Sequence, residues 1–434
     1  MLTVCLVGKP NVGKSTIFNR LIKEKKSIIL DTPGITRDRV YGTVNYMAKR
    51  FHLIDTGGIS LGNGSIDEDI KMQAQLGVDE ADIILFVVDG LSDLNSEDYY
   101  VRDMLLKSNK KVIVVVNKLD NKTRSENIYN YYELGFPVLV GVSGEHNIGF
   151  DELFKIIIED MPDYEKEEHD NLAFSFIGRP NVGKSSLVNA LLNEERVIVS
   201  DVAGTTRDAV DTDFKYNGET YTMIDTAGMR KKGKIYENIE KYSLLRSMKS
   251  IERSDVCVVV VNAEEGIIEH DKHIVSYAIE AGKSVVICVN KWDFIKDPNT
   301  EIKHWNMLLA EEFKFVSYVN HVYVSALTKK RMHTLMPEII KAYESSQIEL
   351  KSSVLNKVID DAYSLHPAPS YKGKRLKIFY VHQTGNAPIK ITLEVNSKSL
   401  VHFSYYRYLE NKIRENFDLT GAPIVLQFKN KDDK

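Results

Sequence analysis

Two stretches of this chain repeat each other, and that repeat most constrains what the chain can fold into. The segment GKPNVGKST at Gly8 returns as GRPNVGKSS at Gly178, 170 positions later. Three further pairs follow at an offset of 170, 170 and 173: DTPGITRD with DVAGTTRD, DTGG with DTAG, and NKLD with NKWD. Self-similarity held over so long a stretch indicates two copies of one module.

The length of 434 residues allows about three domains of about 150 residues each. In each copy of the module, short apolar runs alternate with longer mixed segments, which predicts a mostly parallel sheet flanked by helices, an α/β domain. The stretch MPDYEKEEHDN is charged and nearly free of apolar residues, which predicts an acidic linker. We expect the first domain over 1–160, the linker over 161–171, the second domain over 172–347 and a third over 348–434.

The third domain carries no further repeat. Helical spacing over Ser353–Tyr363, strand-like runs in RLKIFYVHQ and IKITLEVN, a helix over Phe403–Asn416 and a last strand in PIVLQF predict a small α+β domain. From Lys351 onward there are 14 Lys and Arg against 8 Asp and Glu, a net charge of +6 in a chain of net charge −4, so the rest carries −10. This basic excess indicates either a polyanionic partner or a plain solvated face.

The three cysteines, Cys5, Cys257 and Cys288, lie in apolar strand-like runs without the spacing of a metal site. They are typical of reduced core thiols. The longest apolar runs are too short to span a bilayer, and the chain begins in a strand pattern rather than a charged and then apolar leader. We expect a cytoplasmic protein with no membrane or DNA partner.

The pattern GxxxxGK[ST], preceded by a strand and followed by a helix, occurs in both copies. Glycines let successive backbone N–H groups converge on a phosphate, and the helix that follows points its positive end at the same anion. We expect Lys14 and Lys184 to reach the β- and γ-phosphates, and Ser15 and Ser185 to bind Mg²⁺.

The next motifs are expected to sense the γ-phosphate. Asp55 and Asp225 close apolar strands, where a carboxylate holds Mg²⁺ through water, and the N–H groups of Gly58 and Gly228 reach the γ-phosphate. Loss of that last contact on hydrolysis releases the segment behind it.

Between these motifs and the phosphate loops stand two loop threonines, Thr36 and Thr206. Their position suits residues that bind Mg²⁺ and sense the γ-phosphate through hydroxyl and backbone. A turn residue is the simpler reading of each.

Guanine specificity is predicted from the motif NKxD at Asn117 and Asn290. The carboxylates of Asp120 and Asp293 can accept from N1–H and N2–H₂ of guanine, whereas adenine leaves that charge unpaired. Ser143 and Ser325 are expected to complete the pockets. Because Gly144 stands where the second copy has Ala326, we expect a looser supporting loop in the first site.

The predicted GTP-binding residues are therefore Gly8, Lys9, Pro10, Asn11, Val12, Gly13, Lys14, Ser15, Thr16, Asp55, Thr56, Gly57, Gly58, Ile59, Asn117, Lys118, Leu119, Asp120 and Ser143 in the first copy. In the second copy they are Gly178, Arg179, Pro180, Asn181, Val182, Gly183, Lys184, Ser185, Ser186, Asp225, Thr226, Ala227, Gly228, Met229, Asn290, Lys291, Trp292, Asp293 and Ser325. The predicted catalytic set is Lys14, Thr36, Gly58, Lys184, Thr206 and Gly228. The predicted magnesium ligands are Ser15, Thr36, Asp55, Ser185, Thr206 and Asp225.

Ile59 and Met229 occupy the place where many GTPases have a glutamine that orients the attacking water. Neither side chain can hydrogen-bond water, so another device must assist hydrolysis. Asn11 and Asn181 in the phosphate loops are candidates, because a side-chain oxygen there can complete the coordination of K⁺. The alternative is that each asparagine only shapes its loop.

The tandem order GKPNVGKST, DTPGITRD, DTGG, NKLD, then GRPNVGKSS, GTTRD, DTAGMRKK, NKWD resembles the bacterial double-Era-like GTPase family known as Der or EngA. The segments GKRLKIFYVHQTGNAPIKITLEVN and HFSYYRYLENKIRENF are similar to the KH-like domain of that family. The resemblance runs nearly end to end. It implies two P-loop GTPase domains and a KH-like domain, binding of GTP or GDP with Mg²⁺, and a monomer that binds ribosomal RNA while the large subunit matures.

KH domains that clamp single-stranded RNA use a GxxG loop, and the sequence after Lys351 contains none. A surface for folded RNA or for another domain fits better. Candidate phosphate contacts are the basic side chains Arg375, Lys377, His382, Lys390, Arg407, Lys412 and Arg414, which can equally be solvated. Tyr405, Tyr406 and Tyr408 have helical spacing, which favours the core over base stacking.

The run Arg230-Lys231-Lys232-Gly233-Lys234 follows the second DxxG motif. Charge on a segment that moves with the γ-phosphate can couple RNA affinity to nucleotide state, and a plain exposed loop is the alternative. Two other functions stay open: a signalling GTPase whose third domain binds a protein, and a phosphotransferase, which needs an acceptor site that DxxG and NKxD do not supply.

Overall fold

The computed structural model of the chain describes residues 2–23, 41–58, 75, 77–120, 126–163, 171–194, 196–199, 211–226, 240–371 and 373–431. The described residues fall into two compact units, one ending at Asp163 and the other beginning at Asn171. None of the helices in these ranges is long and apolar enough to cross a membrane.

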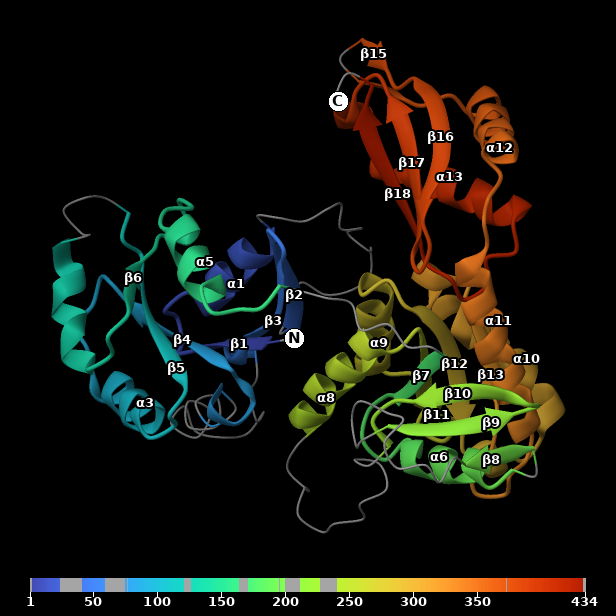
Figure 1. Ribbon diagram of the computed structural model, residues 1–434, viewed down its shortest axis with the longest axis horizontal. Coiled ribbons are helices and arrows are strands. Elements are labelled where there is room, and N and C mark those ends of the chain that lie inside the picture. The colour runs from blue at the N-terminus through green and yellow to red at the C-terminus, as the bar shows by residue number, and fades with distance from the viewer. Residues whose placement is uncertain are drawn as a thin grey trace. The chain divides into compact units, whose positions relative to one another are not determined.

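The first unit is built on a six-stranded sheet in the order β2-β3-β1-β4-β5-β6, in which only β2 runs antiparallel to its neighbour (Figure 1). Its strands are β1 Leu2–Val7, β2 Tyr41–Tyr46, β3 Lys49–Asp55, β4 Ile83–Asp89, β5 Lys111–Asn117 and β6 Leu139–Gly141. Its helices are α1 Lys14–Lys23, α3 Ser96–Leu106 and α5 Phe150–Ile158, with 3₁₀ turns η1 Thr56–Gly58 and η2 Glu126–Leu134.

Burial explains why this sheet forms. The central strands are continuous apolar runs, as expected for parallel strands covered on both faces, and every residue from Ile83 to Val88 is buried. Helix α5 places Phe150, Leu153, Phe154 and Ile157 at the spacing of one helical face, and all are buried in the first core. Met161, just beyond α5, packs on the same core.

The second unit repeats this plan with an added edge strand. The sheet order is β13-β12-β11-β7-β10-β9-β8. The strands are β7 Leu172–Ile177, β8 Val197–Val199, β9 Thr212–Tyr216, β10 Glu219–Met223, β11 Val256–Asn262, β12 Ser284–Asn290 and β13 Asn320–Tyr323. The helices are α6 Lys184–Leu192, α8 Glu240–Arg253, α9 Glu269–Glu280, α10 Pro298–Glu312 and α11 Leu335–Gln347, with turns η3 Trp292–Phe294, η4 Lys314–Val316 and η5 Met332–Thr334.

A small α+β domain completes the second unit. Its three-stranded sheet, in the order β16-β17-β18, pairs β16 and β17 antiparallel and β17 and β18 parallel, and α12 and α13 lie beside it (Figure 1). Its elements are α12 Ser352–Leu365, β14 Ser370–Tyr371, β15 Lys374–Arg375, β16 Ile378–Gly385, β17 Ile389–Val395, η6 Lys398–Leu400, α13 Phe403–Asn416 and β18 Ile424–Asn430. The predicted fold class, two α/β domains and a small α+β domain, is confirmed. The hairpin β14–β15 and the edge strand β8 were not predicted.

The tyrosines of α13 lie where helical spacing placed them. Tyr405 and Tyr406 are buried in the core of the small domain, and the Tyr408 hydroxyl donates to the Ala362 carbonyl at 2.8 Å. Tyr408 thus joins α13 to α12, and the Tyr406 hydroxyl accepts from the Leu426 N–H of β18, so these rings are not free to stack on bases. Likewise, all three cysteines are buried, and burial raises the pKa of Cys257 to about 12.

A backbone joint holds the small domain on the second α/β domain. Gly421 donates from N–H to the Tyr318 carbonyl at 2.8 Å and accepts from the Val285 N–H at 2.9 Å. The Arg414 guanidinium lies 3.5 Å from the centre of the Tyr318 ring and pairs with Glu410 at 3.0 Å. Burial raises the pKa of Tyr318 to about 12. Arg414 is therefore committed to this joint, and the sequence-based view of it as a phosphate contact is wrong.

Gly421 is the residue of the joint least able to accept a side chain. Its φ is +75°, and a Cβ there would lie 2.8 Å from the Ala342 Cβ, whereas Gly373, with φ of +73°, has open space around it. We predict that Gly421→Ala lowers the free energy of unfolding by about 2–4 kcal/mol, because overpacking adds to left-handed strain. Gly373→Ala should cost only about 1 kcal/mol. Urea unfolding measures both, and equal costs would contradict the joint.

Candidate functional site

In each α/β domain, the predicted motifs meet at the carboxyl edge of the sheet. The phosphate loop follows β1, Asp55 ends β3 and Asn117 ends β5. Strand register places Leu6 beside Asp55 and Asp89 beside Asn117. Parallel strands send all their carboxyl ends to one edge, which is where α/β sheets bind ligands.

An asparagine from the NKxD motif ties the loops of each site together. In the first site, Asn117 Nδ2 donates to the Val12 carbonyl at 2.8 Å, and its Oδ1 accepts from the Gly144 N–H at 3.1 Å. In the second, Asn290 makes the same two bonds, to Val182 at 2.9 Å and from Ala326 at 3.1 Å. Both asparagines are buried. One side chain thus fixes the phosphate loop and the serine-bearing loop to the end of a central strand.

This cross-link explains one glycine of each phosphate loop. A Cβ on Gly13 would lie 2.3 Å from Asn117 Nδ2, and a Cβ on Gly183 would lie 2.3 Å from Asn290 Nδ2. The two glycines also have φ of +92° and +95°. A side chain at either position is excluded by both the contact and the backbone.

The lysine side chain of each phosphate loop lies against the backbone carbonyls of that loop. Lys14 Nζ donates to the carbonyls of Gly8 at 2.6 Å and Lys9 at 2.8 Å, and Lys184 Nζ donates to Gly178 and Arg179, both at 2.6 Å. Burial lowers the pKa of Lys14 to about 8, although Asp55 acts in the opposite direction. Each ammonium group is held by carbonyl dipoles at the place where a phosphate is expected.

The serines lie beside the carboxylates that are predicted to bind guanine. Ser143 Oγ donates to Asp120 at 2.7 Å and accepts from the His146 N–H at 3.2 Å. Ser325 makes the same pair of bonds, to Asp293 and from the Thr328 N–H. Both serines are fully buried. They orient the carboxylates, which is a positioning role.

The supporting loop of the first site, where the sequence suggested looser packing at Gly144, has Thr16 against that glycine. A Cβ on Gly144 would lie 2.9 Å from the Thr16 Cγ2. The second site has Ser186 in place of Thr16 and Ala326 in place of Gly144. The methyl group is therefore on the phosphate-loop residue in the first site and on the supporting-loop residue in the second. Arg20 further holds the first loop, donating to the carbonyls of Gly144 at 2.9 Å and Glu145 at 2.8 Å.

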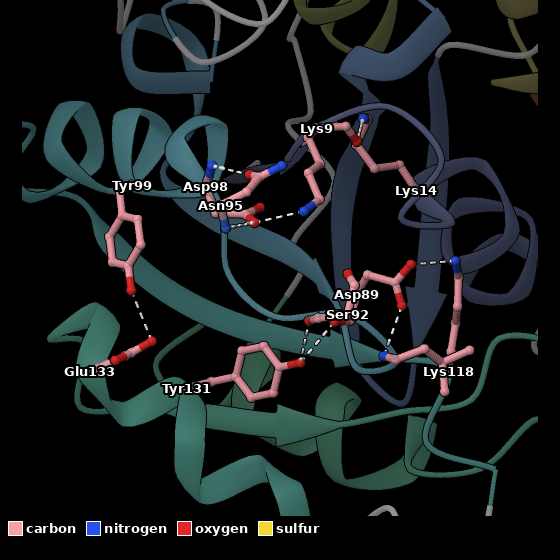
Figure 2. A network of polar contacts seen from close by, with 11 residues as sticks. Lys9, Lys14, Asp89, Ser92, Asn95, Asp98, Tyr99, Lys118, Tyr131 and Glu133 are labelled. Atoms are coloured by element: carbon pink, nitrogen blue, oxygen red, sulfur yellow. Dashed lines mark hydrogen bonds and ion pairs between the residues drawn. The ribbon is translucent and has the colours of Figure 1, made fainter.

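Lys118, the lysine of the first NKxD motif, has two partners across the site. Its Nζ donates to Asp89 at 2.5 Å and to the Asn11 carbonyl at 3.1 Å. The Tyr131 hydroxyl from η2 donates to the Asp89 carbonyl at 2.8 Å (Figure 2). The side chain of Lys118 therefore spans from the end of β4 to the phosphate loop.

Sequence reasoning missed one positioning contact in each site. Lys9 pairs with Asp98 at 2.7 Å (Figure 2), and Arg179 pairs with Asp271 at 3.3 Å. Both aspartates are buried, and both are the third residue of a helix, α3 or α9, where they also accept from the N-cap N–H. Asp98 and Asp271 are 173 residues apart, the offset of the NKxD motifs, and Lys9 and Arg179 stand at the same place in the two phosphate loops. This repeat was the signal that could have predicted the pairs.

Two of the predicted magnesium ligands, Ser15 and Asp55, come together in the first site. Ser15 Oγ donates to Asp55 Oδ2 at 2.5 Å, and Asp55 Oδ1 accepts from the Gly57 N–H at 2.8 Å. In the second site, Asp225 has φ of +59°, its N–H donates to Asp211, and its carboxylate lies 3.5 Å from the Ser250 hydroxyl. A hydroxyl and a carboxylate that already meet at the phosphate loop fit a hard cation such as Mg²⁺.

Several predicted residues lie outside the described ranges. They are Thr36, Ile59, Thr206, Ala227, Gly228, Met229 and the run Arg230-Lys231-Lys232-Gly233-Lys234. Thr56 is described, and its hydroxyl donates to the Leu6 carbonyl at 2.6 Å, which joins the end of β3 to β1.

Comparison with known proteins gives the same three parts. The family described as 50S ribosome-binding GTPase matches residues 3–118 and 173–291, and the KH-domain-like family of EngA bacterial GTPase enzymes matches residues 349–429. The chain is 49% identical over 423 residues to GTPase Der of Listeria monocytogenes (strain HCC23), covering 97% of each chain. It is 52% identical over 427 residues to GTPase Der of Streptococcus suis (strain 05ZYH33), covering 98% of each.

The pair between Lys9 and Asp98 can be tested with little change of shape. We predict that Asp98→Asn keeps an oxygen for the helix cap but weakens GDP binding to the first site about tenfold, or about 1.4 kcal/mol, because Lys9 loses a buried anionic partner. Fluorescent GDP titration measures this in chains whose second site carries Gly183→Ala. Asp103→Asn, on the exposed side of α3, is the matched control, and equal affinities in the two variants would contradict the positioning role.

Proposed function

The chain belongs to the Der, or EngA, family of GTPases, and from that membership we propose that it is a GTP-driven switch in maturation of the large ribosomal subunit. The family assignment confirms the resemblance found in the sequence. The observation that carries the proposal is the duplicated cross-link by Asn117 and Asn290, because two sites of one design allow two nucleotide states per chain. A family described as 50S ribosome-binding, and a basic third domain joined to the second GTPase domain, support ribosomal RNA as the partner.

The proposed organisation keeps the boundaries expected from the sequence. Residues 1–160 and 172–347 form the GTPase domains, 161–171 the linker and 348–434 the KH-like domain. We propose that the chain acts as a monomer in the cytoplasm and that its partner is the large subunit rather than DNA or a membrane.

In the proposed roles, the phosphate-loop backbone with Lys14 and Lys184 holds the β- and γ-phosphates. Asp120 and Asp293 accept from guanine, with Ser143 and Ser325 fixing their direction. The remaining predicted GTP-binding residues line these loops. Specificity for guanine over adenine follows because adenine lacks the N1–H and N2–H₂ donors. Each carboxylate, oriented by its serine, would be left without them.

Magnesium fits the first site, where the Ser15 hydroxyl and the Asp55 carboxylate meet. Ser15 and Asp55, with Thr36, would hold it in the first site, and Ser185, Thr206 and Asp225 would hold it in the second. When bound, the ion supplies positive charge to the phosphate oxygens. Lys14 and Lys184 add a second positive charge, and Gly58 and Gly228 supply N–H donors. This makes Lys14, Thr36 and Gly58, with Lys184, Thr206 and Gly228, the proposed catalytic set.

The proposed aid to hydrolysis is K⁺ bound through Asn11 and Asn181. Both asparagines have left-handed backbone, with φ of +65° and +62°, and both are exposed. The Asn11 carbonyl is already occupied by Lys118, so the side-chain amide oxygen is the group proposed for K⁺. Positive charge there would offset the negative charge that builds up between the β- and γ-phosphates.

We predict that GTP turnover is faster in KCl than in NaCl at equal ionic strength. Asn11→Ala with Asn181→Ala should remove the difference and leave GDP affinity nearly unchanged, because the backbone still cradles the phosphates. Steady-state phosphate release measures the rates, and GDP titration is the control for folding. Equal wild-type rates in the two salts would sink the cation assignment.

The ribosomal role is tested by sedimentation. We predict that the chain sediments with purified large subunits when bound to a non-hydrolysable GTP analogue, and much less with GDP. Gly13→Ala and Gly183→Ala should each reduce this binding, since each would block one phosphate loop. Binding that is absent, or equal with both nucleotides, contradicts the proposal. Capture of a protein partner in ribonuclease-treated extract would favour a signalling GTPase instead.

A further inference from the structure

We propose that one end of the KH-like sheet binds unpaired RNA, by stacking a base on Phe379 and Tyr380 and by pairing phosphates with lysines around them. This inference rests on the proposed function only in taking the RNA to be ribosomal. The site differs from a GxxG clamp, which the sequence lacks. We call it the basic end of the sheet. Its basic members are Lys374, Arg375, Lys377, Lys398, Lys429 and Lys431.

A β-bulge turns two successive aromatic side chains outward. In β16, Ile378 pairs with Val395 and Tyr380 with Glu394, so the register shifts across Phe379. A regular strand would point Phe379 and Tyr380 to opposite faces. Instead Phe379 is 47% exposed and Tyr380 44% exposed. The bulge re-aims a side chain that would otherwise enter the core, a known use of such irregularities beside functional sites.

The neighbours on either side of this pair are ordinary core residues. Ile378 packs against the core of the KH-like domain, and Val381 is buried in it. The exposure of Phe379 and Tyr380 is therefore confined to the bulge and does not reflect a poorly packed strand. Tyr380 is further stacked on His382, with ring centres 5.4 Å apart, which limits its motion.

Positive charge gathers at the same end of the sheet as the two rings. The Lys431 ammonium lies 4.8 Å from the centre of the Phe379 ring, and Lys429 is exposed on the same strand end. The hairpin β14–β15 adds Lys374 and Arg375, both exposed. Glu394 is the register partner of both Tyr380 in β16 and Lys429 in β18, and places one negative charge at this end. Exposed aromatic faces beside basic side chains are features that bind single-stranded nucleic acid without a sequence code.

The backbone that carries these charges is fixed in place. Asn396 accepts from the Lys377 N–H at 2.8 Å and donates from Nδ2 to the Arg375 carbonyl at 3.0 Å, and its own N–H donates to the Lys377 carbonyl at 3.1 Å. One asparagine thus holds the segment between the hairpin and β16. Less ordering is then required when a ligand binds.

The basic end lies at the far end of the sheet from the joint with the second GTPase domain. Strands β17 and β18 start near the joint, where the Ala387 N–H donates to the Ser346 carbonyl, and both end beside Lys398 and Lys431. Seven residues of β17 separate the two ends, about 20 Å at 3.3 Å per residue. The second GTPase domain therefore holds the sheet without covering this surface.

The test uses the full chain with GDP and a fluorescent 12-nucleotide oligouridylate, followed by anisotropy at several salt concentrations. Phe379→Ala and Phe379→Leu should weaken binding about 5- to 150-fold, the range for loss of one stacked base, and Phe379→Trp should retain it. Lys374→Ala with Lys377→Ala and Lys431→Ala should make the salt slope shallower by about 2, at about 0.7 per phosphate contact.

Matched controls lie on α12 of the same domain. Leu365→Ala removes an exposed apolar side chain, and Lys351→Ala with Lys357→Ala removes exposed charge, and both should bind within twofold of the wild type. GTP turnover and thermal unfolding of every variant should match the wild type. A wild type that does not bind the oligomer, Phe379→Ala that binds unchanged, or equal loss in the α12 controls each overturns the inference. So does equal binding of a blunt RNA duplex that is insensitive to Phe379.

Failure of this inference and failure of the ribosomal role give different results. If the chain sediments with large subunits but Phe379→Ala does not change its affinity for the oligomer, only RNA binding at the basic end is ruled out. If oligomer binding depends on Phe379 but the chain sediments with subunits in neither nucleotide state, RNA binding at the basic end is supported. The ribosomal role is then ruled out.

Discussion

The side-chain amide of one asparagine per site is the contact on which both nucleotide sites depend. Asn117 and Asn290 stand at the end of a fully buried central strand, and each fixes the phosphate loop and the serine-bearing loop with one donor and one acceptor. Because these bonds are buried, leaving one unmade costs more than forming it gains. The amide also occupies the space that a side chain on Gly13 or Gly183 would need. Gly13 or Gly183 of the phosphate loop and the asparagine of the NKxD motif are therefore one structural unit, although about a hundred residues separate them.

Around this shared cross-link the two sites differ at several matched pairs of residues. Thr16 lies against Gly144 in the first site, and the second site has Ser186 and Ala326 at the matching positions. The pair between Lys9 and Asp98 became Arg179 with Asp271, and the longer guanidinium also reaches Glu265 and the Gly266 carbonyl. Lys118 pairs with Asp89, the last residue of β4. The matching strand of the second domain, β11, ends in the uncharged Asn262. The two sites thus keep the asparagine cross-link but carry different charges around it, which allows their nucleotide affinities to differ.

Much of this could be predicted from the sequence because the motifs are local and repeated. Glycine loops, the strands before them and the helical spacing of Tyr405 and Tyr406 are short-range patterns, and the structure follows them. The contacts that were missed depend on long-range register. Nothing near Asp98 in the sequence points to Lys9, and the outward turn of Phe379 exists only because β16 shifts against β17. Arg414 looked like a free basic residue, since its partner Tyr318 belongs to another domain. The sequence also suggested a looser loop at Gly144, because only the structure shows Thr16 filling the space.

The most direct test of this account is calorimetric titration of the nucleotide-free chain with GDP, for the wild type, Gly13→Ala, Gly183→Ala and Gly218→Ala. Gly218 also has a left-handed backbone, with φ of +92°, but has nothing near it that a Cβ would meet. The account predicts two GDP sites in the wild type and in Gly218→Ala, and one site in each of the other two variants. It would be contradicted by two sites in Gly13→Ala or Gly183→Ala, or by the loss of a site in Gly218→Ala.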